Sequence, residues 1–204
     1  MPQPFIHRLG KLKVGPPALE AQPELAKLMA LVIVSWTALE TSQAMMFCTL
    51  MDGEDDVSLD IYHAFIDPKL RQEVFLTVAK RHCSAAWIDG YNKFCSHLKP
   101  SSKARNKVAH STWCYTDEHP DCLCVIEEKD ISAGFVRTLQ TALADYSSRV
   151  ELDDTFIGKK LTRYNAKDFS DILQAMYKLG QVSLGLAVRM GIPDKQPSHE
   201  RSPT

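Results

Sequence analysis

The segment of this chain best suited to chemistry on a phosphate group reads Arg105-Asn106-Lys107-Val108-Ala109-His110. Asn106 and His110 are four residues apart, so on a helix they share one face. Arg105 lies about 140° around the helix axis from His110, yet its long side chain can still reach the same pocket. Guanidinium groups bind phosphate, and imidazole groups transfer protons near neutral pH. The segment is therefore the strongest candidate site in the sequence.

Positive charge gathers around this segment. Lys99, Lys103 and Lys107 lie within it or close to it and add positive charge that could contact a ligand containing phosphate. The sequence Pro100-Ser101-Ser102 predicts a break or kink in the helix, after which a serine could cap a new turn. Arg105 would then lie near a helix N-terminus, where a cation opposes the helix dipole although free N–H groups attract phosphate. A cation placed against the helix dipole within a polar cluster is a mild indication of function.

Glu40 is a second candidate. It falls within the apolar stripe of the first long helix, which contains Trp36 and Phe47. A carboxylate on an apolar stripe is seldom left unpaired, so Glu40 could hold Arg105 or orient His110. The favoured alternative is that Glu40 lies at the edge of the stripe and extends into water.

The histidines and cysteines that follow the segment raise the possibility of a metal site. The residues concerned are His110, Cys114, His119, Cys122 and Cys124. Zinc would suit such ligands, but the Cys-x2-Cys spacing of a zinc knuckle is absent. Ordinary hairpin residues are the favoured interpretation, and we expect no metal site.

Helices must position most of these residues. Apolar residues recur at spacings of three and four, and the chain has only nine glycines in 204 residues. The clearest start signals are Pro23, the pair Asp67-Pro68, and Asn165 with its expected capping partner Asp168. The expected helices cover approximately residues 23–51, 58–65, 68–82, 84–98 with a short continuation at 103–110, 135–150 and 166–190. The expected fold is an all-α bundle of five to six helices.

A small β-hairpin is expected around residues 112–128 of this bundle. Apolar residues alternate on both sides of the turn sequence at 117–121, which is typical of a hairpin. The three tryptophans, Trp36, Trp87 and Trp113, are expected in the core because large aromatic side chains are mostly buried.

Composition and charge limit the class of protein. The 24 basic and 25 acidic residues give a formal net charge of −1, which excludes a protein that coats nucleic acid by bulk charge. The N-terminus has no apolar core of signal-peptide length, and the longest strongly apolar run, residues 28–34, is too short to span a bilayer. We therefore expect a cytoplasmic protein that does not contact a membrane, with an extended arm at 1–21, one helical domain at 22–192 and a disordered tail at 193–204.

The Arg105–His110 segment resembles the Arg-x(4–6)-His motif of HEPN domains, including the polar residue that often follows the arginine. The all-helical layout over residues 23–192 is also similar. The resemblance implies a metal-independent endoribonuclease that uses no cofactor and cleaves RNA by attack of a ribose 2′-OH. Such domains occur in toxin–antitoxin and phage-defence systems, so an antitoxin protein is a candidate partner.

HEPN domains of this type pair so that two motifs face each other across a cleft, which implies a homodimer. Cleavage needs one group that accepts a proton and another that donates one, and two chains supply His110 twice. The resemblance assigns Arg105 to the scissile phosphate and Asn106 to orienting His110 or binding the phosphate. The alternative is a non-catalytic, HEPN-like dimeric scaffold that binds a nucleotide or a partner protein.

Overall fold

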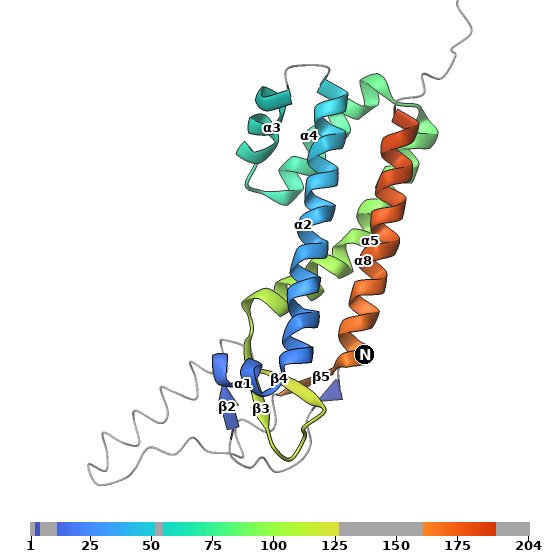
Figure 1. Cartoon of the computed structure of the whole chain (residues 1–204). Coiled ribbons are helices and arrows are strands. Elements are labelled where there is room, and N and C mark those ends of the chain that lie inside the picture. Colours follow the sequence, from blue (N-terminus) through green and yellow to red (C-terminus); the bar gives the residue numbers. More distant parts are fainter. Residues whose placement is uncertain (1–2, 5–11, 52–54, 127–160, 191–204) are drawn as a thin grey trace, which may run out of the picture. The chain divides into compact units, whose positions relative to one another are not determined.

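The computed structural model describes residues 3–4, 12–51, 55–126 and 161–190. These residues are mostly helical and include a small antiparallel sheet (Figure 1), so the expected helical fold with a β-hairpin is confirmed at this level. The helices are α1 (Pro16–Ala21), α2 (Pro23–Met51), α3 (Asp55–Ala64), α4 (Pro68–His82), α5 (Ala85–His110) and α8 (Ala166–Met190). The strands are β1 (Gln3–Pro4), β2 (Leu12–Val14), β3 (Thr112–Thr116), β4 (Cys122–Ile126) and β5 (Thr162–Asn165).

The chain divides into two compact units. Unit 1 comprises Met1–Ser35 and Ser101–Ala175, and unit 2 comprises Trp36–Pro100 and Met176–Thr204. Helices α2, α5 and α8 each contribute residues to both units. The sheet belongs to unit 1, whereas α3 and α4 belong to unit 2.

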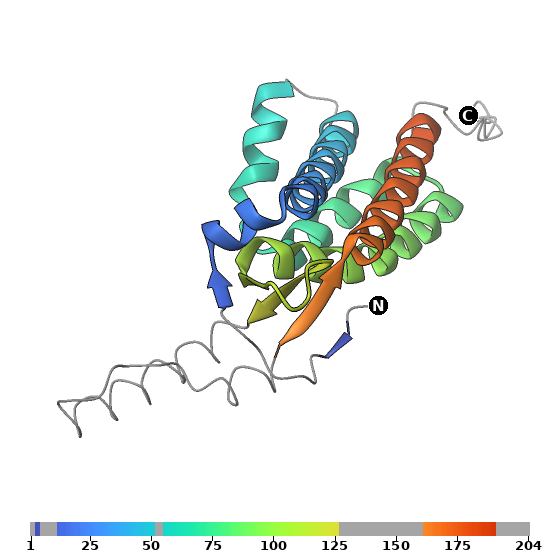
Figure 2. The same ribbon diagram turned by 60° about the horizontal axis from the view of Figure 1, so that its bottom comes forward.

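The sheet of unit 1 is antiparallel, with the strand order β1-β5-β4-β3-β2. β3 and β4 form the expected hairpin, in which Cys114 lies opposite Cys124. β2, in the segment expected to be an extended arm, pairs with β3 at one edge. β5 pairs with β4 and runs directly into α8 (Figure 2). The hairpin is thus the centre of a larger sheet that local patterns do not reveal.

Gly15 turns the chain from β2 into α1. Its φ of +71° is a left-handed conformation that favours glycine, and its N–H donates to the carbonyl of Trp113 at 2.8 Å. Pro16 then occupies the first position of α1, where its missing N–H costs nothing. α1 packs on β2 and β3 through the buried Ala18.

An aromatic cluster forms the core of unit 1 on one face of the sheet. Trp113 lies edge-on to Tyr164, with 5.3 Å between the ring centroids, and 5.7 Å from Phe169 at the start of α8. On β4 every residue is buried, so both faces of the sheet are covered there.

Stacked aromatic rings form the core of unit 2. Phe75 of α4 stacks on Tyr91 of α5 at 4.4 Å between centroids, and Trp87 stacks on Tyr91 at 5.4 Å. The indole N–H of Trp87 donates to the carbonyl of Leu186 at 3.0 Å, which fixes α5 to α8. The burial of all three tryptophans, Trp36, Trp87 and Trp113, confirms their expected place in the core.

Two of the predicted helix starts are confirmed by side-chain caps. The carboxylate of Asp67 accepts the N–H of Lys69 at 2.8 Å, and Pro68 follows as the first residue of α4. Asn165 and Asp168 cap α8 reciprocally, each side chain accepting the backbone N–H of the other residue at 3.1 Å and 3.0 Å.

Pro100 does not end a helix, contrary to expectation. α5 runs from Ala85 to His110 as a single helix with Pro100 inside it. An internal proline removes one hydrogen bond and costs about 3 kcal/mol, but buried residues such as Phe94 and Val108 hold the helix on both sides of it. Neither Ser101 nor Ser102 can therefore be an N-cap.

The start of α3 also differs from expectation. The helix begins at Asp55, three residues before the expected start at 58, and Ser58 is a buried residue within it. Acidic residues at 55 and 56 suit a helix N-terminus, which explains the earlier start. The helix expected at 135–150 and the tail at 193–204 lie outside the described residues.

Within the described part of the chain, α2 is long and apolar enough to cross a membrane by length and composition. Its most apolar window has a mean hydropathy of 1.3, and 28% of that window is buried. Core helices of soluble proteins meet the same criterion, so the expected lack of membrane contact stays a prediction.

Candidate active site at the end of helix α5

The Arg105–His110 segment forms the C-terminal end of α5. His110 is the last residue of the helix, and β3 begins two residues later. Basic side chains here complement the partial negative charge of a helix C-terminus. The expectation that Arg105 lies near a helix N-terminus is therefore wrong, because Pro100 does not end the helix. A cradle of free N–H groups cannot contribute to phosphate binding, and the side chains must do so.

The polar side chains of the segment are accessible to different degrees. Asn106 and His110 are exposed, and Arg105 is half-buried. The Nη1 of Arg105 donates to the side-chain oxygen of Asn106 at 3.0 Å. Its Nε is buried and has no hydrogen-bond partner among the described residues. A buried donor without a partner costs about 1–3 kcal/mol, so a movement of the guanidinium onto an anion would relieve a cost.

Trp113 anchors the turn that carries His110. Its indole N–H donates to the carbonyl of Val108 at 3.1 Å, and the N–H of Ser111 donates to the carbonyl of Lys107 at 3.2 Å. Trp113 is itself held by the aromatic core of unit 1. The bond from Trp113 therefore fixes the last turn of α5 to β3, and the bond from Ser111 continues the helix up to His110. This role is not evident from the sequence, in which Trp113 is a core residue that happens to follow the segment.

The lysines are divided between the two units. Lys103 and Lys107 belong to unit 1 with Arg105, whereas Lys99 belongs to unit 2. The ammonium of Lys107 lies 6.0 Å from the ring centroid of Tyr164, at the outer limit of a cation–π contact. Burial raises the pKa of that tyrosine, which keeps the phenol neutral beside the basic segment.

Glu40 lies in unit 2, where it is half-buried. Its charge acts on Tyr62, whose pKa is raised mainly by burial and further by the Glu40 carboxylate. The role expected for Glu40, to hold Arg105 or orient His110, stays a prediction.

Three thiols share one face of the sheet on β3 and β4. Hydrogen bonding with Cys114, together with burial, raises the pKa of Cys124 to about 12. Hydrogen bonding with Cys124, together with burial, also raises the pKa of Cys122. Among the residues that the structure describes, no three histidine, cysteine or acidic side chains are placed to hold a metal ion. Cys122 and Cys124 are therefore protonated core groups at neutral pH.

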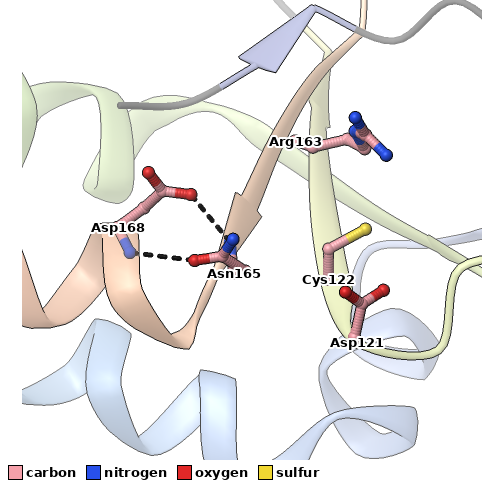
Figure 3. Close-up of a pocket in the computed structure, with 5 residues that line it drawn as sticks. All are labelled: Asp121, Cys122, Arg163, Asn165 and Asp168. Carbon is pink, nitrogen blue, oxygen red and sulfur yellow. Dashed lines mark hydrogen bonds between the residues drawn. The ribbon is translucent and has the colours of Figure 1, made fainter.

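A polar hollow of about 240 Å³ opens beside β4, β5 and the start of α8 in unit 1 (Figure 3). It is lined by Asp121, Cys122, Arg163, Asn165 and Asp168. The last two residues are engaged with each other in the cap of α8, as the dashed lines in Figure 3 show. Arg163 and Asp168 also take part in further interactions. The sequence indicates only the cap, because the short β5 has no clear alternating pattern.

The candidate site thus consists of three side chains on the last two turns of one helix, with Trp113 behind them. Comparisons with models of protein families, with curated proteins and with solved structures find no match to this chain. The function must therefore be argued from what Arg105, Asn106 and His110 can do chemically.

Proposed function

We propose that this protein is a metal-independent endoribonuclease of the HEPN type, acting in a toxin–antitoxin or phage-defence system. The observation that supports it is the arrangement of the Arg105–His110 segment on one helix end. The imidazole and the amide are exposed there, and the guanidinium is bonded only to Asn106 among the described residues. These are the groups that cleavage of a phosphodiester without a metal ion requires.

The reaction is an attack within the RNA strand. A base removes the proton of a ribose 2′-OH, and the oxygen forms a bond to the adjacent phosphorus. The bond from phosphorus to the 5′-oxygen breaks, and an acid protonates that oxygen. The products are a 2′,3′-cyclic phosphate and a 5′-OH, and no redox change occurs. Each chain contributes one His110, so a pair of chains supplies the base and the acid.

Arg105 and Asn106 bind the phosphate in this scheme. A guanidinium forms two parallel hydrogen bonds to phosphate oxygens and stabilises the charge that develops on them. The side-chain oxygen of Asn106 accepts a hydrogen bond from the guanidinium before a phosphate binds. The amide N–H groups of Asn106 can donate to the phosphate or to His110. Lys99, Lys103 and Lys107 add local charge for the RNA backbone, which the net charge of −1 does not supply.

The non-catalytic scaffold is less well supported. In a scaffold, Arg105 would be held in buried ion pairs, and His110 would not need to be exposed. Within the described residues Arg105 forms no ion pair, and His110 is exposed. A nucleotide-binding role shares the phosphate chemistry and differs in that the bound molecule stays intact.

The test is cleavage of bulk RNA by the purified protein in excess EDTA. We expect wild type to produce fragments with 2′,3′-cyclic phosphate ends, and Arg105→Ala and His110→Ala to produce none above background. The matched control is His97→Ala, which replaces another exposed histidine of α5. Circular dichroism confirms that each variant is folded.

Two results would contradict the proposal. Equal cleavage by wild type, Arg105→Ala and His110→Ala would indicate a contaminating nuclease. Activity that EDTA abolishes would exclude the metal-independent mechanism. Binding of a nucleotide without cleavage, lost in Arg105→Ala, would favour the scaffold.

A further inference from the structure

The outer face of α3 and the start of α4, in unit 2, carry apolar side chains that nothing in the described structure covers. We refer to this face as the α3 surface. It consists of Asp56, Val57, Asp60, Ile61, Ala64, Ile66, Asp67 and Leu70, all of which are exposed. Exposed apolar patches with a polar rim often mark sites of protein interaction.

The apolar part of the α3 surface follows from helix geometry. Val57, Ile61 and Ala64 are spaced by four and three residues, so they share one side of α3. The exposed fractions are 52% for Val57 and 36% for Ile61, and they rise to 88% for Ile66 in the turn that follows. Leu70, in the first turn of α4, is 46% exposed.

Ile66 is exposed because its usual partner position is occupied by a charged residue. A hydrophobic residue just before an N-cap commonly packs on the fourth residue of the helix. Here the cap is Asp67, and the fourth residue is Arg71. The guanidinium of Arg71 instead donates to the carbonyl of Phe65 and lies over the ring of Tyr62. Ile66 therefore lacks the apolar contact that this position of α4 usually provides, and it is 88% exposed.

The rim of the α3 surface is acidic. Asp56 and Asp60 are one helical turn apart beside the apolar strip, and neither forms an ion pair with another described residue. Asp67 adds a third carboxylate, which caps α4 by accepting the N–H of Lys69. The nearest lysine in sequence, Lys69, is paired with Glu73 at 3.8 Å. The α3 surface, with its apolar side chains and acidic rim, is thus complementary to a surface that is both aliphatic and basic.

We propose that the α3 surface docks a basic amphipathic helical segment of a partner protein. The aliphatic side of such a segment would cover Val57, Ile61 and Ile66, and its lysines or arginines would face Asp56 and Asp60. A second copy of this chain fits less well, because a two-fold contact would place these aspartates opposite each other, and like charges across an interface are costly. The proposal is independent of RNA cleavage, which the Arg105–His110 segment carries.

The small size of the α3 surface predicts a transient complex. Interfaces below the standard size are weak, so we expect a micromolar dissociation constant. Because the rim charges are exposed, binding should weaken as the salt concentration rises.

A defined probe tests the docking directly. It is a fluorescein-labelled 18-residue peptide of leucine and lysine, with leucines on one helical face, measured by fluorescence anisotropy with the full chain. We expect saturable binding, weakened at least tenfold by the double variant Asp56→Lys/Asp60→Lys and at least fivefold by Ile66→Ser. The matched controls are Asp117→Lys/Glu118→Lys, which reverses two exposed charges of unit 1, and Val188→Ser, which removes an exposed valine of α8.

Each outcome decides the proposal. Loss of binding in the α3 variants, with unchanged binding in both controls, supports it. Equal binding by all variants, or no binding by wild type, overturns it. Self-association of the protein that Ile66→Ser abolishes would make a second copy the occupant and would also overturn it. The variants should cleave RNA as wild type does, so a failed docking test leaves the nuclease test unaffected.

Discussion

The two halves of α5 have opposite characters although they form one helix. In the first half, Ala85–Pro100, the rings of Trp87, Tyr91 and Phe94 are buried in the aromatic core of unit 2. In the second half, Ser101–His110, the buried residues are Ser101 and Val108, and the remaining side chains are at least partly exposed and mostly polar.

Under the proposed function, this contrast separates stability from chemistry along a single element. Large buried rings contribute most to the free energy of unfolding, whereas exposed polar residues contribute little to it. The second half of α5 can therefore carry reactive groups at little cost to the fold. Its position is fixed by Trp113, which bonds to the backbone of the last turn and not to the reactive side chains.

The largest effect is expected from His110 and Arg105. We expect His110→Ala to lower the rate of RNA cleavage at least about 100-fold, because a proton-transfer group is lost. The free energy of unfolding should stay within about 0.5 kcal/mol of wild type. Arg105→Lys should restore little activity, because an ammonium cannot form the two parallel bonds of a guanidinium. Fluorogenic RNA cleavage and urea unfolding measure both quantities, and a large loss of stability in His110→Ala would remove the contrast between the halves.

The reverse effect is expected in the first half. Phe94→Ala should lower the free energy of unfolding by about 3–5 kcal/mol, because it leaves a cavity in a packed aromatic core. Urea unfolding measures the loss, with His97→Ala as a control on the exposed side of the same half. A cost for Phe94→Ala no larger than that of His97→Ala would show that the first half is not a packing element.

A matched pair of tryptophan variants sharpens the comparison. Trp113→Phe and Trp87→Phe each remove one indole hydrogen bond to a carbonyl, of Val108 and Leu186 respectively. Each should cost about 1 kcal/mol of stability. Only Trp113→Phe should also lower kcat, by about tenfold with little change in KM, because a misplaced His110 transfers protons more slowly. Equal kcat values in the two variants would show that Trp113 does not position His110.

The smallest effect is expected from the thiols of the sheet beside the second half. The pKa of Cys124, about 12 in the folded chain, lies above that of an unfolded thiol. The unfolded state therefore binds fewer protons between about pH 9 and pH 12, and stability should fall as the pH rises through this range. Urea unfolding at several pH values measures the slope, which should be shallower in Cys124→Ser. A slope unchanged by this substitution would contradict the assignment.

Local signals in the sequence predicted the starts of α2, α4 and α8. Asp67 and the Asn165–Asp168 pair satisfy nearby backbone N–H groups, and Pro23 and Pro68 lack the N–H that a first turn would leave unpaired, so these signals are readable without tertiary structure. Pro100 shows the limit of such signals, because burial on both sides of it outweighs its local cost. The pairing of β2 with β3 and of β5 with β4 depends on distant segments, which a local pattern does not encode.

The helical placement of the candidate segment was predictable from the sequence, but its structural setting was not. The spacing of Asn106 and His110 on one helix follows from sequence, and the structure places both on the exposed end of α5. The bond between Arg105 and Asn106 and the buried Nε depend on rotamers, and the anchoring by Trp113 depends on the sheet. The sequence predicted the wrong helix end for Arg105, because that prediction depended entirely on a helix break at Pro100.

The position of β5 in the sheet has a consequence for how the protein is made. The ribosome adds about 5–20 residues per second and releases the chain from its N-terminus. Trp113 therefore emerges well before Tyr164 and Phe169, the rings that pack against it. Until those residues are synthesised, the anchor behind His110 is incomplete. Under the proposed function, RNA cleavage would therefore be slower during the chain's own translation, when the messenger RNA that encodes it is the nearest substrate.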